Sequence, residues 1–146
     1  ATDRCNMVKL AIKPFDYMSL STIETDRPGN TYTADTLAQI YDSYKKIYFI
    51  IGADSLLYIQ DWYHPEYICS HCHLLCATRD NNSASVLIDQ KHFLADKYGA
   101  VIDFIDVPEL PYSSTDIRKK VAMGLSVKED VGEEVEEYIK SRKLYV

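Results

Sequence analysis

The sequence from Ser113 to Arg118 places three hydroxyl side chains and a cation within about two helical turns. One hydroxyl can cap a helix by accepting from a free N–H of the first turn. Asp116 follows Ser113 at capping-box spacing. A cap needs neither the other hydroxyls nor Arg118. Free N–H groups, hydroxyls and a guanidinium can also form a phosphate-binding site. On this stretch alone the cap is favoured, with an anion site as the alternative.

A second candidate lies in the stretch FIIGADSL, residues 49–56. Gly52 lets a ligand approach the backbone, and Asp54 can accept hydrogen bonds from ribose hydroxyls. A simple strand-to-helix turn explains the same residues equally well. Trp62 and Tyr63 come just beyond, and an indole there can stack on a flat heterocycle. A core tryptophan is the commoner fate of that residue type.

The run CSHCHLLC, residues 69–76, suggests zinc at first sight. It holds one Cys-x-x-Cys pair and no second pair at finger spacing. Cys76 lies inside an apolar run, where cysteine behaves as a small hydrophobic residue. We therefore expect no protein-bound zinc.

Three apolar runs, at 47–54, 73–78 and 100–107, predict buried strands of a parallel sheet. A further strand is expected at 17–24 from its alternation. Helices are expected at 3–12, at 34–46 with Thr33 as the cap, at 83–99, from the Ser113 region to Gly124, and at 129–144. Residues 54–70 read as helix or loop, broken near Pro65.

Alternating strands and helices predict an α/β fold with a parallel sheet. Ligands of such sheets bind outside the carboxyl ends of the strands. This rule places residues 52–54, 78–79 and 113–118 on one edge. The shared edge strengthens the phosphate interpretation of the serine-rich stretch.

The composition limits the remaining possibilities. A chain of 146 residues predicts one domain, 1–146. A net charge of −6 argues against a nucleic-acid surface. The sequence shows no membrane-length apolar run, no signal peptide and no secreted disulfide pattern, so we expect a cytoplasmic protein without a membrane partner. No nucleophile motif or Walker loop is present, so an enzyme here would work by positioning and electrostatics.

The motifs together resemble a known family. RPGNTYTADTL (27–37), YFIIGADSLLYIQDWY (48–63) and YSSTDIR (112–118) occur in this order, and VEEYIKSRKLY closes the chain. The sequence is similar to nicotinate-nucleotide adenylyltransferases. The resemblance implies a Rossmann-like, three-layer nucleotidyltransferase sheet. It also implies transfer of the adenylyl group of ATP, with Mg²⁺, to nicotinate mononucleotide, which gives deamido-NAD and pyrophosphate.

The resemblance implies a role for each matching position. Trp62 would stack on the nicotinate ring, backbone amides would take its carboxylate, and Asp54 would bind ribose. The acceptor-binding residues would be Thr33, Asp54, Trp62 and Tyr63; those for ATP and its phosphates would be Gly52, Arg79, Ser114, Thr115 and Arg118. Arg79 is the weakest match, because Asp80 follows it where the family often has proline. Tyr112 replaces a residue that is usually aliphatic in the family.

One family motif does not occur in the 146 residues. The family has a glycine-rich strand end and a His-x-Gly-His motif that grips ATP, whereas SHCH at 70–73 is a different pattern. We therefore expect a carboxyl-terminal portion of a single nucleotidyltransferase domain that lacks an amino-terminal βαβ portion. Such a chain would have two unpaired sheet edges, contain no catalytic residue of its own and be inactive alone.

Two alternatives remain open for the function. The chain could come from an adenylyltransferase for another phosphorylated acceptor, or it could be a non-catalytic nucleotide-binding module. The Tyr-Thr pair and Trp62–Tyr63 argue against the first. The oligomeric state is open, and a homo-oligomer is compatible with the sequence.

Overall fold

A computed structural model describes residues 1–78, 84–108 and 112–146. The chain forms two compact units. The sheet unit is Arg27–Glu109, and the helical unit combines Ala1–Asp26 with Leu110–Val146. Each unit is described by itself below.

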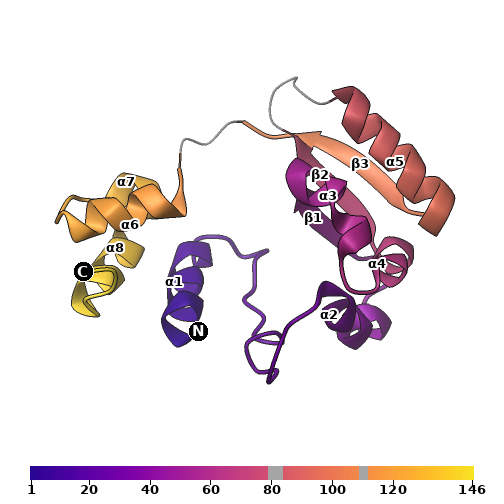
Figure 1. Cartoon of the computed structure of the whole chain (residues 1–146). Helices are drawn as coiled ribbons and strands as arrows, with labels where there is room; N and C mark the ends of the chain where they lie inside the picture. Colours follow the sequence, from indigo (N-terminus) through magenta and orange to yellow (C-terminus); the bar gives the residue numbers. More distant parts are fainter. Residues whose placement is uncertain (79–83, 109–111) are drawn as a thin grey trace. The chain divides into compact units, whose positions relative to one another are not determined.

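The sheet unit contains three parallel strands in the order β1-β2-β3 (Figure 1). They are β1 (Tyr48–Gly52), β2 (His73–Thr78) and β3 (Val101–Asp106). In the register, Gly52 pairs with Ala77 and Thr78 pairs with Asp106, so the strands end together at one edge. The three strands expected from the apolar runs are therefore confirmed, as is the parallel sheet.

One face of this sheet carries the core of the unit. Ile51, Leu74, Cys76 and Ile102 are at most 4% exposed. They lie on one face because successive strand residues alternate between faces. Helices α3, α4 and α5 contact the strands of this sheet. The strands were expected to be buried on both faces. On the opposite face, however, Ile50 is 67% exposed.

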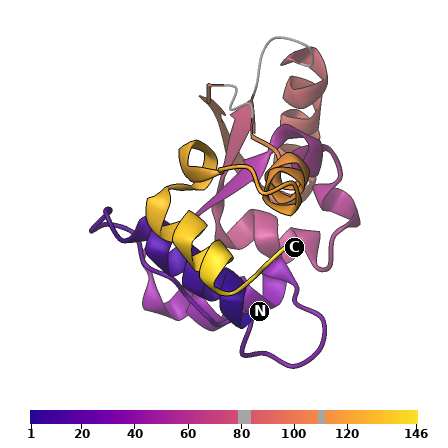
Figure 2. The same cartoon turned by 90° about the vertical axis from the view of Figure 1, so that its left-hand side faces the viewer.

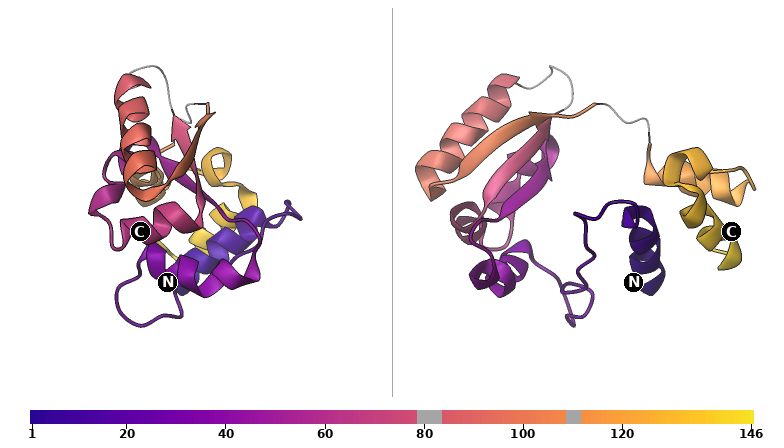
Figure 3. Two further views of the ribbon diagram at one scale, coloured as in Figure 1. Left: turned by 90° about the vertical axis from the view of Figure 1, so that its right-hand side faces the viewer. Right: turned by 180° about the vertical axis from the view of Figure 1, so that it is seen from behind.

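The described helices of the sheet unit precede β1 or connect the strands (Figure 3). They are α2 (Thr33–Ile40), α3 (Ala53–Leu57), α4 (Pro65–His71) and α5 (Ala84–Tyr98), with 3₁₀ turns at Tyr41–Ser43 and Ile59–Asp61. Gly99 ends α5 in the left-handed region with φ +67°. The break expected near Pro65 is confirmed, since Pro65 is the first residue of α4.

The start and end of α2 differ from the prediction. The helix was expected to continue to residue 46, but it ends at Ile40, and Tyr44 beyond it is 62% exposed. A continued helix would have gained no buried face there. The capping prediction for Thr33 was also wrong. Tyr32 occupies the N-cap position in an extended conformation without a side-chain cap, and Thr33 is the first helical residue.

The helical unit contains α1 (Thr2–Ile12), α6 (Ser114–Ala122), α7 (Lys128–Val131) and α8 (Glu133–Ser141). Helices α1 and α8 lie side by side although they come from opposite ends of the chain (Figure 2). The Asn6 amide donates to the Tyr138 hydroxyl at 2.8 Å, and that hydroxyl donates to Asp3 at 2.9 Å. These bonds join the amino-terminal helix to the carboxyl-terminal one.

Two other predictions fail in this unit. The strand expected at 17–24 is absent, because the described part of the helical unit offers no strand edge with which it could pair. The single helix expected at 129–144 is divided at Gly132, whose φ of +86° and ψ of 159° do not continue a helix.

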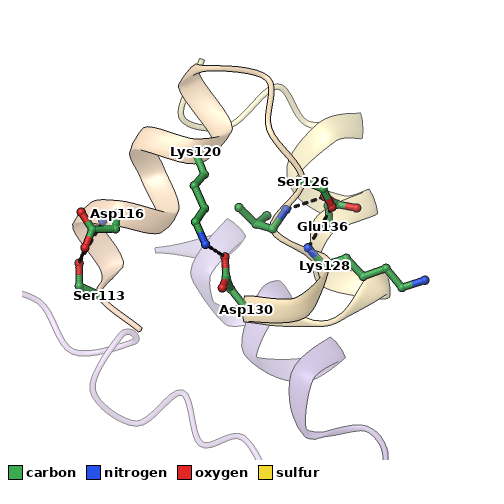
Figure 4. A network of polar contacts seen from close by, with 8 residues as sticks. Ser113, Asp116, Lys120, Ser126, Lys128, Asp130 and Glu136 are labelled. Carbon is green, nitrogen blue, oxygen red and sulfur yellow. Dashed lines mark hydrogen bonds and ion pairs between the residues drawn. The ribbon is translucent and has the colours of Figure 1, made fainter. Parts of the chain in front are cut away.

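This break turns α8 so that Glu136 faces the segment before α7 (Figure 4). Its nearly buried carboxylate accepts from the Ser126 hydroxyl at 2.7 Å and from the Val127 N–H at 2.8 Å. Lys140 lies 2.9 Å away on the same helix. Hydrogen bonds from Ser126, Lys140 and Val127 lower the pKa of Glu136 to about 2.

Across the described ranges, none of the helices has the length and apolar character needed to cross a membrane.

Candidate functional site

The carboxyl end of β1 leads directly into α3. Gly52 occupies the N-cap position of α3 without a side-chain cap, and Asp54 lies in the first turn. Asp54 is exposed. Its carboxylate is thus available to a ligand at the sheet edge, where the sequence predicted it. The alternative in which Asp54 or Ser55 caps the helix is not observed, because Gly52 holds that position.

Gly52 has no conformational reason to be glycine. Its φ of −77° and ψ of 157° are accessible to any residue. A Cβ atom built on Gly52 would have no described atom within 4 Å. The fold of the described residues therefore does not require glycine here, which leaves close approach by a ligand as an explanation for it.

Aromatic rings from two distant segments meet in the sheet unit. The rings of Tyr32 and Tyr63 lie with their centroids 4.5 Å apart. Tyr32 directly precedes α2, and Tyr63 follows the 3₁₀ turn after α3. Thr33 directly follows Tyr32, so this contact joins the segment at the start of α2 to the segment that holds Trp62 and Tyr63. We call Tyr32, Trp62 and Tyr63 the aromatic cluster.

Trp62 takes the core-packing role of the two that the sequence left open, and it keeps part of its surface exposed. It is partly buried and packs against the core of the sheet unit. Its ring meets Phe49 of β1 edge-on, with centroids 6.3 Å apart and planes at 68°. This packing fixes the indole on one side, and the incomplete burial leaves part of it to solvent.

The structure shows which of the three hydroxyls at the start of α6 caps the helix. The Ser113 hydroxyl accepts from the Asp116 N–H at 3.0 Å and donates to the Asp116 carboxylate at 2.8 Å (Figure 4). Ser113 is therefore the N-cap. The Asp116 carboxylate bonds the Ser113 hydroxyl, whereas a full capping box would bond the Ser113 backbone N–H.

The remaining polar groups of this turn are not needed for the cap. Ser114, Thr115 and Arg118 are exposed, and the Arg118 guanidinium donates to the Ser114 hydroxyl at 3.4 Å. The first N–H groups of a helix have no partner inside the helix. The turn thus presents N–H groups, hydroxyls and a cation together, which is the chemistry of an anion site. We call Ser114, Thr115 and Arg118 the α6 turn.

The other predicted edge position is Arg79, which lies outside the described residues. Thr78, directly before it, ends β2 opposite Asp106. Of the predicted residues, Trp62 and Tyr63 belong to the aromatic cluster, and Thr33 directly follows its third member, Tyr32. Gly52 and Asp54 belong to the same unit, whereas the α6 turn belongs to the helical unit.

The cysteine run forms part of the core. Burial raises the pKa of Cys69 to about 11 and that of Cys72 to about 12. The Cys72 thiol donates to the Ile68 carbonyl in α4 at 3.1 Å. Protonated thiols are poor metal ligands. Within the part of the chain that the structure describes, no three His, Cys, Asp or Glu side chains gather as a metal site.

Sequence reasoning missed one residue beside the aromatic cluster. His64 follows Tyr63 and adopts the left-handed conformation, with φ 50° and ψ 59°. Its ring meets the Tyr63 ring edge-on at 4.2 Å between centroids. The dipeptide His64-Pro65 gave no signal for this conformation, because the residue before a proline is normally extended.

Comparison with known proteins defines the class of the chain. Residues 1–120 match the cytidylyltransferase-like family. The fold agrees with a solved structure of Plasmodium falciparum nicotinic acid mononucleotide adenylyltransferase complexed with APC. The TM-score is 0.73 at 18% identity, over 99% of this chain and 75% of that one. The predicted nucleotidyltransferase fold is thereby confirmed.

Curated relatives narrow the class further. A probable nicotinate-nucleotide adenylyltransferase from Lachnoclostridium phytofermentans is 35% identical over 98% of this chain and 72% of its own length. One with the same name from Caldicellulosiruptor bescii is 36% identical over 99% and 74%. The chain therefore belongs to the nicotinate-nucleotide adenylyltransferase family, as the sequence motifs indicated.

Proposed function

We propose that the chain serves the transfer of an adenylyl group from ATP to nicotinate mononucleotide, with deamido-NAD and pyrophosphate as products. Membership of the family supports this reaction. The observation that supports the choice of acceptor is the aromatic cluster, in which Tyr32 meets Tyr63 at 4.5 Å between ring centroids. A planar, electron-poor pyridine ring is the ligand that such a cluster suits.

The acceptor would be held by three kinds of contact. Trp62 would stack on the nicotinate ring with its solvent-accessible part. The carboxylate of the nicotinate would take N–H groups of the first turn of α2 together with the Thr33 hydroxyl, since a helix N-terminus favours an anion. Asp54 would accept from ribose hydroxyls. Tyr63 would support the stack through its contact with Tyr32.

The α6 turn would hold the phosphates of ATP, and Gly52 would let a substrate pass close to the backbone. The donors of this turn are hydroxyls and a guanidinium, and its carboxylate, Asp116, is already engaged by Ser113. This donor set fits a phosphate chain rather than a bare cation. Mg²⁺ would therefore be held mainly by the phosphate oxygens of ATP and by water, and would neutralise charge on the phosphates.

The chemical step would be an in-line displacement at the α-phosphorus of ATP. A phosphate oxygen of nicotinate mononucleotide forms the new P–O bond while the bond to pyrophosphate breaks, and pyrophosphate leaves with its electron pair. Such transfers depend on cations that neutralise developing charge. In this chain Arg118 would bind the phosphates, and we assign none of the 146 residues a catalytic role. Because His-x-Gly-His does not occur in the 146 residues, we expect substrate binding with little or no turnover.

A titration tests this proposal. Trp62 is the only tryptophan, so quenching of its fluorescence reports directly on the acceptor site. We expect nicotinate mononucleotide to quench it saturably. Flavin mononucleotide and phosphopantetheine, measured by calorimetry, should bind more weakly. Saturable binding of phosphopantetheine in preference to nicotinate mononucleotide would contradict the proposal and favour a different acceptor.

An internal control comes from a second surface of the same unit. Tyr58 is 63% exposed and lies outside the aromatic cluster. Tyr58→Ala should leave the affinity for nicotinate mononucleotide unchanged. The cytoplasmic location, homo-oligomer formation and the lack of nucleic-acid binding stay predictions from the sequence.

A further inference from the structure

His64 combines a strained backbone with a position next to the aromatic cluster. Its φ is 50°, and the next residue is Pro65. Positive φ is uncommon outside glycine, and the residue before proline normally adopts an extended conformation. Glycine would adopt the left-handed conformation without steric cost. Strained residues of this kind concentrate at binding and catalytic sites. The question is therefore why histidine, and not glycine, occupies this position.

Packing in the core does not explain the side chain. The His64 side chain is 53% exposed. It lines a cavity of about 610 Å³ between α2, α4 and the end of α5, where Asp35 and Lys97 also lie. A side chain that faces a cavity gains little from burial there. Its position must therefore be fixed by specific contacts.

Two contacts fix the His64 ring from opposite sides. Its Nδ1–H donates to the Glu66 carboxylate at 2.8 Å. The ring meets Tyr63 edge-on, with planes at 73° and centroids 4.2 Å apart. The hydrogen bond from His64 lowers the pKa of Glu66, which therefore stays ionised at neutral pH. Glu66 lies in the first turn of α4, where a carboxylate is favourable.

The backbone of His64 is anchored as well. Its carbonyl accepts from the N–H groups of Tyr67 at 3.1 Å and Ile68 at 3.2 Å, which begins α4. The contacts therefore run from α4 through Glu66 and His64 to Tyr63, and on to Tyr32 ahead of α2. This series connects a core helix, whose Ile68 is fully buried, to an exposed aromatic pair.

We propose that His64 is a positioning residue for the pyridine-nucleotide acceptor. Its ring, held by Glu66, fixes Tyr63 against Tyr32, so that the acceptor meets a preformed aromatic surface. The inference deepens the proposed function and rests on it for the identity of the ligand. Preorganisation of this kind raises affinity because fewer side chains are ordered on binding.

The test uses three variants of the 146-residue chain and two readouts. His64→Gly keeps the left-handed backbone and removes the ring. His64→Asn also tolerates that backbone and keeps a donor for Glu66, but it has no ring. Glu66→Ala removes the anchor of the ring. The control is His92→Ala, since His92 is an exposed histidine on α5. The readouts are near-ultraviolet circular dichroism of the ligand-free chain and quenching of Trp62 by nicotinate mononucleotide.

We expect His64→Gly and His64→Asn to weaken nicotinate mononucleotide binding about three- to tenfold, the value of one aromatic contact. Both should reduce the aromatic circular dichroism without lowering the melting temperature, and Glu66→Ala should have a smaller effect in the same direction. His92→Ala should match the wild type.

Wild-type affinity in His64→Asn would overturn the role of the ring, since that variant keeps the backbone and the hydrogen bond. If the wild type does not bind nicotinate mononucleotide, the proposed function fails instead. The circular dichroism of the ligand-free variants then decides separately whether His64 orders the aromatic pair. An unchanged spectrum in both His64 variants would overturn the inference.

Discussion

The aromatic cluster and the α6 turn are built in opposite ways. The cluster brings Tyr32 and Tyr63 together from segments 31 positions apart, and Trp62 within it is held by Phe49 of a neighbouring strand. The α6 turn and the Ser113 cap beside it lie within six consecutive residues, 113–118, and the cap is a pair of hydrogen bonds between Ser113 and Asp116. One site depends on the tertiary fold, and the other is local.

This difference predicts how each site responds to change. Damage to the aromatic cluster should cost stability and ligand affinity together, because Trp62 packs against the core. At the start of α6, stability and ligand affinity should change independently, because the capping residue and the exposed anion-binding residues are different side chains. The following substitutions test this contrast.

The largest effect is expected for Trp62→Ala. It should abolish measurable binding of nicotinate mononucleotide and also lower the free energy of unfolding by about 2 kcal/mol, below the usual cost for a fully buried tryptophan. Calorimetry and urea unfolding measure the two quantities. Trp62→Phe is the matched control and should recover most of the stability and part of the affinity. A Trp62→Ala chain of unchanged stability would show that the indole does not support the core.

Glu136 tests through pH the stability of the helical unit to which α6 belongs. Its pKa is lowered to about 2 from an ordinary value of 4.5. The stabilisation is therefore fully present above pH 4.5 and is lost as the pH falls toward 2. Urea unfolding followed by far-ultraviolet circular dichroism should show this loss for the wild type. Glu136→Gln should be less stable at neutral pH and should lose less stability than the wild type over this range.

Trp62 fluorescence provides the comparison, because it reports on the sheet unit. We expect its unfolding midpoint to change less between pH 4.5 and 2 than the helical signal does. Identical pH profiles for the wild type and Glu136→Gln would contradict the assigned role of Glu136.

Arg118→Ala should weaken ATP binding about tenfold, as expected for one charge-assisted hydrogen bond to phosphate. The melting temperature should not change, because Arg118 is exposed. Lys119→Ala is the control, since Lys119 is an exposed cation on the same helix that pairs with Asp116. Equal losses of ATP affinity in the two variants would indicate a general effect of charge rather than a specific contact between Arg118 and phosphate.

The smallest and most selective effects on stability and ATP affinity are expected for Ser113 and Ser114. Ser113→Ala should lower the free energy of unfolding by about 1 kcal/mol through loss of the cap and change ATP affinity little. Ser114→Ala should do the reverse, with a few-fold loss of ATP affinity, the value of a neutral hydrogen bond, at unchanged stability. Urea unfolding and calorimetry measure both. The same response in both variants would remove the distinction between cap and anion site.

The sequence predicted the features whose signals are local or strongly apolar. The strand at 73–78 was placed correctly because a continuous apolar run has few alternatives, and the cap at Ser113 was found because its partner Asp116 lies within one turn. The strand expected at 17–24 failed because alternation indicates two faces but does not supply a pairing partner. Gly132 was read as an interior helix residue, since a single glycine does not reveal its φ in advance.

The geometry of the aromatic cluster was beyond local reasoning. Family motifs pointed to Thr33, Trp62 and Tyr63, but the contact of Tyr63 with Tyr32 depends on how α2 packs against α4. The role of His64 was missed for the same reason. Its left-handed backbone results from the turn that the chain must make between two helices, and residue type alone does not specify that turn.

The reactivity of the buried thiols reports when the sheet unit opens. Cys69 and Cys72 are 2% and 7% exposed, with pKa values raised to about 11 and 12. An alkylating reagent at neutral pH therefore modifies them only when α4 separates from the strands. Cys5 lies half-buried in α1 of the other unit. Cys5 can therefore react without such an opening, so mass spectrometry of timed alkylation can follow the opening of the sheet unit with Cys5 as a partly exposed reference thiol.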